Sequence, residues 1–131
     1  MKALIVEDDI TCRMVLQRLL EPFGQCDIAV DGQEGVTIFK MSLESQAPYD
    51  LVCLDIMMPN MDGHEVLKQI RAMEAEAGIT GLSGVKTIMV TALSDAKTIL
   101  RAFNDQCEAY IVKPIDKEKL YRQLRQMNLI D

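Results

Sequence analysis

The stretch Leu51–Gly63 constrains the fold of this chain more than any other. Its first four residues are apolar and run directly into Asp55. An apolar run without polar alternation is typical of a central parallel strand, because both faces of such a strand are buried. Pro59 and the tetrad 60–63 then predict a turn. We therefore expect Asp55 at the carboxyl end of a strand, where open α/β folds place their functional groups.

The same pattern recurs along the chain. Besides the strand that ends at Asp55, we expect strands at Ala3–Val6, Cys26–Val30, Val85–Thr91 and Ala109–Val112. Apolar residues at helical spacing follow each strand and indicate five amphipathic helices. Five strand–helix units with short links predict an α/β fold, a doubly wound five-stranded parallel sheet with helices on both faces. We expect one domain over residues 1–131, with no output domain after the last helix.

The sequence also predicts which residues cap the helices and which face the core. Asp95 and Asp116 are placed to cap the fourth and fifth helices. The spacing of Leu100 and Phe103 predicts that both face inward in the fourth helix. His64, the only histidine of the chain, is expected to be a surface residue in the first turn of the third helix.

Charge and composition exclude several classes of function. The formal net charge of −6 argues against nucleic acid or an anionic membrane as a direct partner. No apolar run approaches the length of a membrane span, and the run before Glu7 is too short for a signal sequence. The four cysteines include no C-x-x-C pair, which favours reduced thiols in a cytoplasmic protein.

Polar side chains at four expected strand ends form the candidate site. Glu7–Asp9 follow the first strand, Asp55 ends the third, Thr91 ends the fourth, and Lys113 follows the fifth. Since parallel strands all point the same way, these residues should meet at one edge of the sheet. Two carboxylates about 4 Å apart repel by roughly 4 kcal/mol at an effective dielectric constant of about 20. The cluster therefore needs cations: Lys113 supplies one charge, and oxygen ligands favour Mg²⁺ as another.

This set of groups is suited to phosphoryl transfer. Mg²⁺ would offset the repulsion between the acids and an incoming phosphoryl group, and Asp55 would act as the nucleophile and form an acyl phosphate. Thr91 and Lys113 would hold the phosphoryl oxygens.

Four segments resemble the receiver domains of bacterial two-component response regulators, and the resemblance covers nearly the whole chain. The segments are Leu4–Asp9, Asp55–Gly63, Val90–Ala92 and Tyr110–Ile115. The chain is most similar to the single-domain, chemotaxis-type receivers. By analogy, the resemblance implies the strand order 2-1-3-4-5. It also implies a sensor histidine kinase as phosphodonor and a downstream protein target that binds the face made by the fourth helix, fifth strand and fifth helix.

The resemblance assigns roles to individual residues. Asp55 matches the phosphoacceptor, and Glu7, Asp8, Asp55 and the backbone carbonyl of Met57 match the Mg²⁺ site. The side chain at the position of Met57 helps to decide how water reaches the phosphoryl group, and a thioether cannot orient water by hydrogen bonding.

Thr91, Ala92 and Lys113 match the phosphoryl-binding positions, and Thr91 and Tyr110 match the switch pair. Two positions depart from the pattern, since many members have proline at Thr87 and glycine at Gln106. The loop 74–84 is also longer than in the compact chemotaxis members.

Three other functions compete with the signalling switch, which would phosphorylate and slowly dephosphorylate itself without being a turnover enzyme. A phosphatase of the haloacid-dehalogenase kind needs a second aspartate two residues after the nucleophile, where Met57 stands. An FMN binder of the flavodoxin kind needs a phosphate loop after the first strand, where Glu7–Asp9 would repel phosphate. A receiver that only scaffolds would not need Asp55, Thr91 and Lys113 intact.

Overall fold

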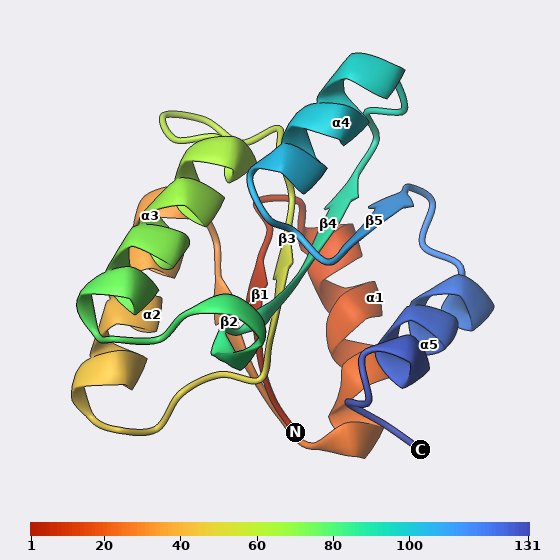
Figure 1. Cartoon of the computed structure of the whole chain (residues 1–131). Helices are drawn as coiled ribbons and strands as arrows, with labels where there is room; N and C mark the ends of the chain where they lie inside the picture. The colour runs from red at the N-terminus through yellow and green to blue at the C-terminus, as the bar shows by residue number, and fades with distance from the viewer.

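Strands and helices alternate along the whole chain (Figure 1). The structure is a computed structural model that describes residues 1–131, apart from the side chain of Leu82. The elements are β1 (Lys2–Val6), α1 (Ile10–Leu20), β2 (Gln25–Ala29), α2 (Gly32–Glu44), β3 (Leu51–Leu54), α3 (Gly63–Glu76), β4 (Lys86–Thr91), α4 (Ala96–Asn104), β5 (Ala109–Val112) and α5 (Lys117–Gln126). Short 3-10 helices follow α1 at Glu21–Phe23 and α3 at Gly81–Ser83.

The strands form one parallel sheet in the order β2-β1-β3-β4-β5, which confirms the predicted fold and strand order. Figure 1 shows α2 and α3 on one side of the sheet and α1 and α5 on the other. Among the described residues, none of the helices combines the length and apolar character needed to cross a bilayer.

Alternate residues of the central strands contribute to two hydrophobic cores, one on each face of the sheet. On β1, Leu4 and Val6 pack under α2 and α3, whereas Ala3 and Ile5 pack under α1 and α5. This division follows from the two-residue period of a strand, whose side chains point to opposite faces in turn. Burial on both faces explains why the central strands contain no alternation of polar and apolar residues.

The caps predicted for the fourth and fifth helices are both formed. The Asp95 carboxylate accepts a hydrogen bond from the backbone N–H of Thr98, and the Asp116 carboxylate accepts one from that of Glu118. The inward prediction for α4 is wrong, because Leu100 is 63% exposed and Phe103 45% exposed. α4 buries its small residue Ala102 against the core instead, which leaves the larger apolar side chains in solvent.

The prediction for His64 is also wrong, since this residue is only 3% exposed. Its Nδ1 lies 3.4 Å from Oδ2 of Asp105, the residue that follows α4. His64 stands three positions before Leu67, which lies on the buried face of α3. Residues three apart share one face of a helix, so the histidine belongs to the apolar stripe.

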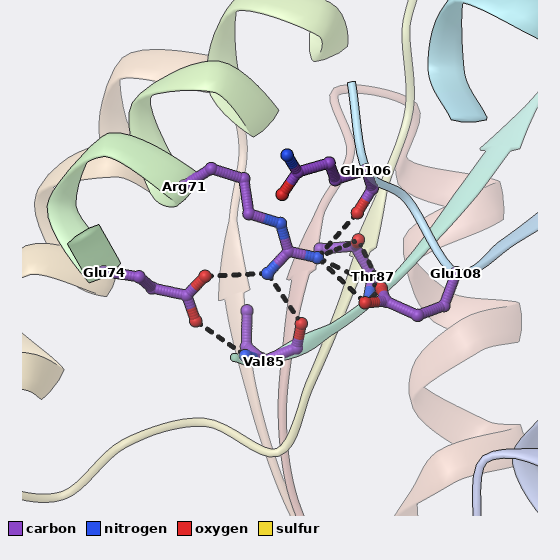
Figure 2. Close-up of polar contacts among 6 residues, drawn as sticks. All are labelled: Arg71, Glu74, Val85, Thr87, Gln106 and Glu108. Atoms are coloured by element: carbon purple, nitrogen blue, oxygen red, sulfur yellow. Dashed lines mark hydrogen bonds and ion pairs between the residues drawn. The ribbon is translucent and has the colours of Figure 1, made fainter. Parts of the chain in front are cut away.

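A single arginine joins α3 to the amino-terminal end of the sheet (Figure 2). Arg71 Nη1 donates to Oε1 of Glu74 at 2.7 Å and to the carbonyl of Val85 at 2.9 Å. The other oxygen of Glu74 accepts from the backbone N–H of Val85 at 2.6 Å. Glu74 is 4% exposed, so this carboxylate depends on the arginine for compensation of its charge.

The second nitrogen of Arg71 contacts both positions that depart from the family pattern. Nη2 donates to the carbonyl of Gln106 at 2.8 Å, to the hydroxyl of Thr87 at 3.1 Å and to the Glu108 carboxylate at 3.1 Å. The backbone N–H and the hydroxyl of Thr87 also donate hydrogen bonds to Oε2 of Glu108. A proline at position 87 would remove the backbone donor. Thr87 and Gln106 therefore belong to one polar network, the Arg71 network (Arg71, Glu74, Val85, Thr87, Gln106 and Glu108).

Replacing Arg71 with methionine should lower the free energy of unfolding by about 3–5 kcal/mol, because it leaves the buried Glu74 carboxylate without its charged partner. Urea denaturation followed by circular dichroism measures the change. The matched control is Lys40→Ala, which breaks an exposed pair with Glu44 at 4.0 Å and should cost about 0.5 kcal/mol or less. Equal losses in the two variants would contradict a stabilising role for the Arg71 network.

Candidate functional site

The ends of β1 and β3 place two acidic residues side by side. The backbone N–H of Asp55 donates to the carbonyl of Val6 at 3.1 Å, which extends the pairing of the two strands by one residue. Glu7 and Asp55 are 1% and 5% exposed, whereas Asp8 is exposed. Carboxylate oxygens of these three residues lie within 4.8 Å of one another. The predicted acidic cluster is therefore formed, and it opens to solvent at Asp8.

The lysine after β5 neutralises part of this cluster. Lys113 Nζ lies 2.5 Å from Oε1 of Glu7 and 3.0 Å from Oδ2 of Asp55. Its backbone N–H donates to the carbonyl of Thr91 at 2.8 Å, which fixes the residue beside the end of β4. Burial alone would lower the pKa of the Lys113 ammonium, but its contacts with Glu7 and Asp55 outweigh burial and raise that pKa. Lys113 therefore stays charged at neutral pH.

One lysine does not compensate for all the acids. Burial, together with the nearby Asp55, raises the pKa of Glu7 from 4.5 to about 7. Glu7 therefore keeps its proton to a higher pH than an ordinary glutamate does when no metal ion is bound. The proton stabilises the metal-free fold fully below about pH 4.5, and this stabilisation is lost as the pH rises through about 7.

The donor set fits a hard divalent cation. Three carboxylates offer oxygen ligands at one point, with neither cysteine nor histidine among them. Mg²⁺ prefers such ligands and keeps several of its waters, which the exposed position of Asp8 allows. Met57 lies at the same edge, where its backbone N–H donates to Oδ1 of Asp55 at 3.2 Å.

Sequence reasoning missed two residues that support the site. Arg13 Nη1 donates to the carbonyls of Glu7 and Asp8, each at 3.1 Å, and so holds the acidic loop from within α1. A Cβ on Gly63 would lie 2.3 Å from the carbonyl oxygen of Asp55, so only glycine lets α3 begin this close to β3. The turn signal at Gly63 was visible in the sequence, whereas nothing in it marked Arg13.

The expected switch residues lie at the end of β4 and in β5. Thr91 is fully buried, Ala92 is exposed, and the Tyr110 ring packs against the core while its hydroxyl donates to the carbonyl of Leu93 at 2.7 Å. Burial raises the pKa of Tyr110 to about 12, so this hydroxyl remains a donor at physiological pH. Tyr110 is thereby attached to the loop that follows Thr91.

Comparison with known proteins assigns the class of this site. The model of the response regulator receiver domain family matches residues 3–125, and the chain belongs to this family. Receiver domains are phosphorylation-controlled signalling switches that accept phosphate from histidine kinases, act on downstream targets and bind Mg²⁺ in an acidic pocket. The phosphatase alternative is not supported.

Two curated relatives have sequences close to this chain over most of its length. Regulatory protein VanRB of Enterococcus faecalis is 34% identical over 121 residues, which are 92% of this chain and 49% of that protein. Sensory/regulatory protein RpfC of Xanthomonas campestris is 32% identical over 120 residues, which are 92% of this chain and 15% of that protein. The chain thus spans about half the length of VanRB and a smaller part of RpfC.

Solved structures share the fold. A chain of the CheX–CheY–BeF3–Mg²⁺ complex from Borrelia burgdorferi has a TM-score of 0.82 and 27% identity, covering 97% of this chain and 88% of its own. A CheY-like receiver domain from Methanospirillum hungatei has a TM-score of 0.77 and 26% identity, covering 98% and 92%. The chemotaxis-type resemblance agrees with these neighbours.

Mg²⁺ should stabilise the fold more at pH 8 than at pH 6, because it must displace the proton of Glu7. At ten times its dissociation constant, measured at pH 8, it should add about 1.4 kcal/mol and raise the melting temperature by about 3–5 °C. With the pKa of Glu7 near 7, binding at pH 6 should be about tenfold weaker.

Thermal denaturation with and without Mg²⁺ measures both effects. Asp8→Asn should remove most of the shift, whereas Asp31→Asn, at the start of α2, should keep it. A shift in Asp8→Asn equal to that of the wild type would contradict the metal site.

Proposed function

We propose that this chain accepts a phosphoryl group on Asp55 and thereby changes its affinity for a protein partner. The observation that carries the proposal is the Lys113 ammonium held between Glu7 and Asp55, beside the exposed Asp8. Asp55 offers a carboxylate as nucleophile, and Lys113 offers a positive charge for the group that arrives. In this proposal residues 1–131 act as one receiver domain in the cytoplasm.

The proposed transfer uses groups at the ends of β1, β3, β4 and β5. An Asp55 oxygen forms the bond to phosphorus while the bond to the donor, a phosphohistidine of a sensor kinase, breaks and the imidazole leaves. Glu7, Asp8, Asp55 and the Met57 carbonyl would hold Mg²⁺, which would supply positive charge near the phosphoryl oxygens.

Lys113, the Thr91 hydroxyl and the Ala92 N–H bind the phosphoryl oxygens. Hydrolysis then regenerates the Asp55 carboxylate, so the chain passes through one slow cycle of modification and does not turn over a substrate.

Thr91 and Tyr110 transmit the effect of phosphorylation to the partner surface. The phosphoryl group adds up to about two negative charges and three acceptor oxygens, to which the Thr91 hydroxyl can donate. Moving Thr91 towards Asp55 displaces the loop that follows it. In the unphosphorylated structure, the Leu93 carbonyl of this loop accepts a hydrogen bond from the Tyr110 hydroxyl. Loss of that hydrogen bond frees Tyr110 to change rotamer, which makes it a two-state element biased by the phosphoryl group.

Exposed apolar side chains favour the α4–β5–α5 face as the partner surface. Leu100, Phe103 and Val112 are 63%, 45% and 39% exposed, and they lie on α4 and β5. Solvent exposure of large apolar residues is costly for a monomer when they cluster, and such patches are typical of protein interfaces. The partner in this proposal is a protein, and neither nucleic acid nor a membrane binds directly.

Acetyl phosphate with Mg²⁺ should add one phosphoryl group to the wild type, measured by intact-mass spectrometry. Asp55→Asn should take up none. Asp50→Asn changes an exposed aspartate that precedes β3 at its opposite end, and should take up as much as the wild type. Equal uptake by Asp55→Asn and the wild type would refute the assignment of the phosphoacceptor.

Thr91→Ala should still be phosphorylated but should transmit the signal poorly, because it lacks the hydroxyl donor. Amide chemical shifts of residues 92–112, recorded by NMR before and after phosphorylation, should change much less in Thr91→Ala than in the wild type. Thr37→Ala, an exposed position on α2, serves as the control. Equal shift changes in the wild type and Thr91→Ala would show that the signal takes another route.

A further inference from the structure

An exposed methionine lies next to the candidate phosphoacceptor. Met57 is 58% exposed, follows Asp55 by two residues and donates its backbone N–H to Oδ1 of that carboxylate. Its side chain lines a pocket of about 510 Å³ together with Met58, Leu93 and Thr98. The thioether is therefore open to solvent on a residue whose backbone is hydrogen-bonded to the candidate phosphoacceptor.

The thiols of the chain are poor competitors for an oxidant. Cys53 and Cys107 are buried, and burial raises the pKa of each to about 12. Burial likewise raises the pKa of Cys12 to about 11 and that of Cys26 above its ordinary value. The thiolate is the form that peroxide attacks, and very little of it exists at neutral pH. A thioether carries no such proton and reacts wherever it is exposed.

Only location distinguishes Met57 from the other well-exposed methionines. Met14 and Met41 are 56% and 61% exposed, but they lie on α1 and α2 and do not line the pocket of Met57. Oxidation at those positions adds a polar group to a surface already in water. Oxidation at Met57 adds one beside the group that carries the phosphoryl.

We propose that Met57 is a redox modification site, at which conversion to the sulfoxide by hydrogen peroxide shortens the lifetime of the phosphorylated state. The inference rests on the proposed phosphorylation of Asp55. In the oxidation, the sulfur forms a bond to one peroxide oxygen and the O–O bond breaks. The departing hydroxide takes the proton of the transferred hydroxyl and leaves as water. Sulfur loses two electrons and the peroxide gains them.

The sulfoxide changes the hydrolysis because its oxygen is a strong hydrogen-bond acceptor, which the thioether is not. The attacking water donates to the sulfoxide oxygen and is oriented towards phosphorus. A bond from that water to phosphorus then forms as the phosphorus–oxygen bond to Asp55 breaks, and the proton goes to the released phosphate. One such hydrogen bond corresponds to about a 2- to 10-fold faster decay. Methionine sulfoxide reductases reverse the oxidation, so the effect is a switch.

The experiment measures decay of the phosphorylated protein by intact mass, before and after treatment with hydrogen peroxide, with peptide mapping of the sulfoxides. Treated wild type and treated Met41→Leu should both decay faster by about 2- to 10-fold. Phosphorylated Met57→Leu should lose its phosphoryl group at the same rate with and without peroxide treatment. Met57→Gln, which carries a carbonyl acceptor on a chain of similar length, should decay faster than Met57→Leu without any oxidant.

Normal phosphoryl uptake with an unchanged decay in protein oxidised at Met57 would overturn the inference alone, and so would equal acceleration in Met57→Leu. Peroxide treatment that oxidises Met14 and Met41 while leaving Met57 intact would overturn it as well. A lack of phosphoryl uptake by untreated protein would instead refute the proposed function, and the inference with it.

Discussion

The Lys113 ammonium, held between two buried carboxylates, is the interaction on which the site depends. Glu7 follows β1, Asp55 follows β3 and Lys113 follows β5, so one cation ties together the ends of three strands. Two carboxylates this close repel each other, and burial increases the cost. The raised pKa of Glu7 shows that one lysine compensates only in part. A divalent cation would offset the negative charge that remains.

A second buried arrangement balances charge at the opposite end of the sheet. The Arg71 network joins α3 to the beginning of β4 and to the residues before β5. β4 and β5 are therefore held at their amino ends by an arginine and at their carboxyl ends by the site lysine. The Arg71 network includes no residue of α4, which contacts the core through Ala102 and leaves its larger apolar residues exposed. Thr91 of the proposed switch ends β4, at the opposite end of that strand from the Arg71 network.

The sequence predicted the parallel strands and the acidic cluster because both depend on local patterns, whereas the strand order was implied only by the resemblance to receiver domains. Apolar runs ending in polar residues locate parallel strands, and parallel strands bring their ends to one edge. The contacts of Arg71 could not be predicted, since Gln106 and Glu108 lie 35 and 37 residues further along the chain. The proximity of His64 to Asp105 likewise joins residues far apart in the chain. In α4, periodicity located an apolar stripe at Leu100 and Phe103, but periodicity cannot say whether a stripe faces the core or a partner.

The central claim is that the charge cluster exists to hold Mg²⁺ and a phosphoryl group on Asp55. A crystal structure of the chain with Mg²⁺ and beryllofluoride, a mimic of the phosphoryl group, tests it most directly. The account predicts beryllium bonded to an Asp55 oxygen, Mg²⁺ on Glu7, Asp8, Asp55 and the Met57 carbonyl, and Lys113 moved from Glu7 onto fluoride. An empty Asp55 with Lys113 still bound to Glu7, at concentrations of both ions that saturate a functional receiver, would contradict it.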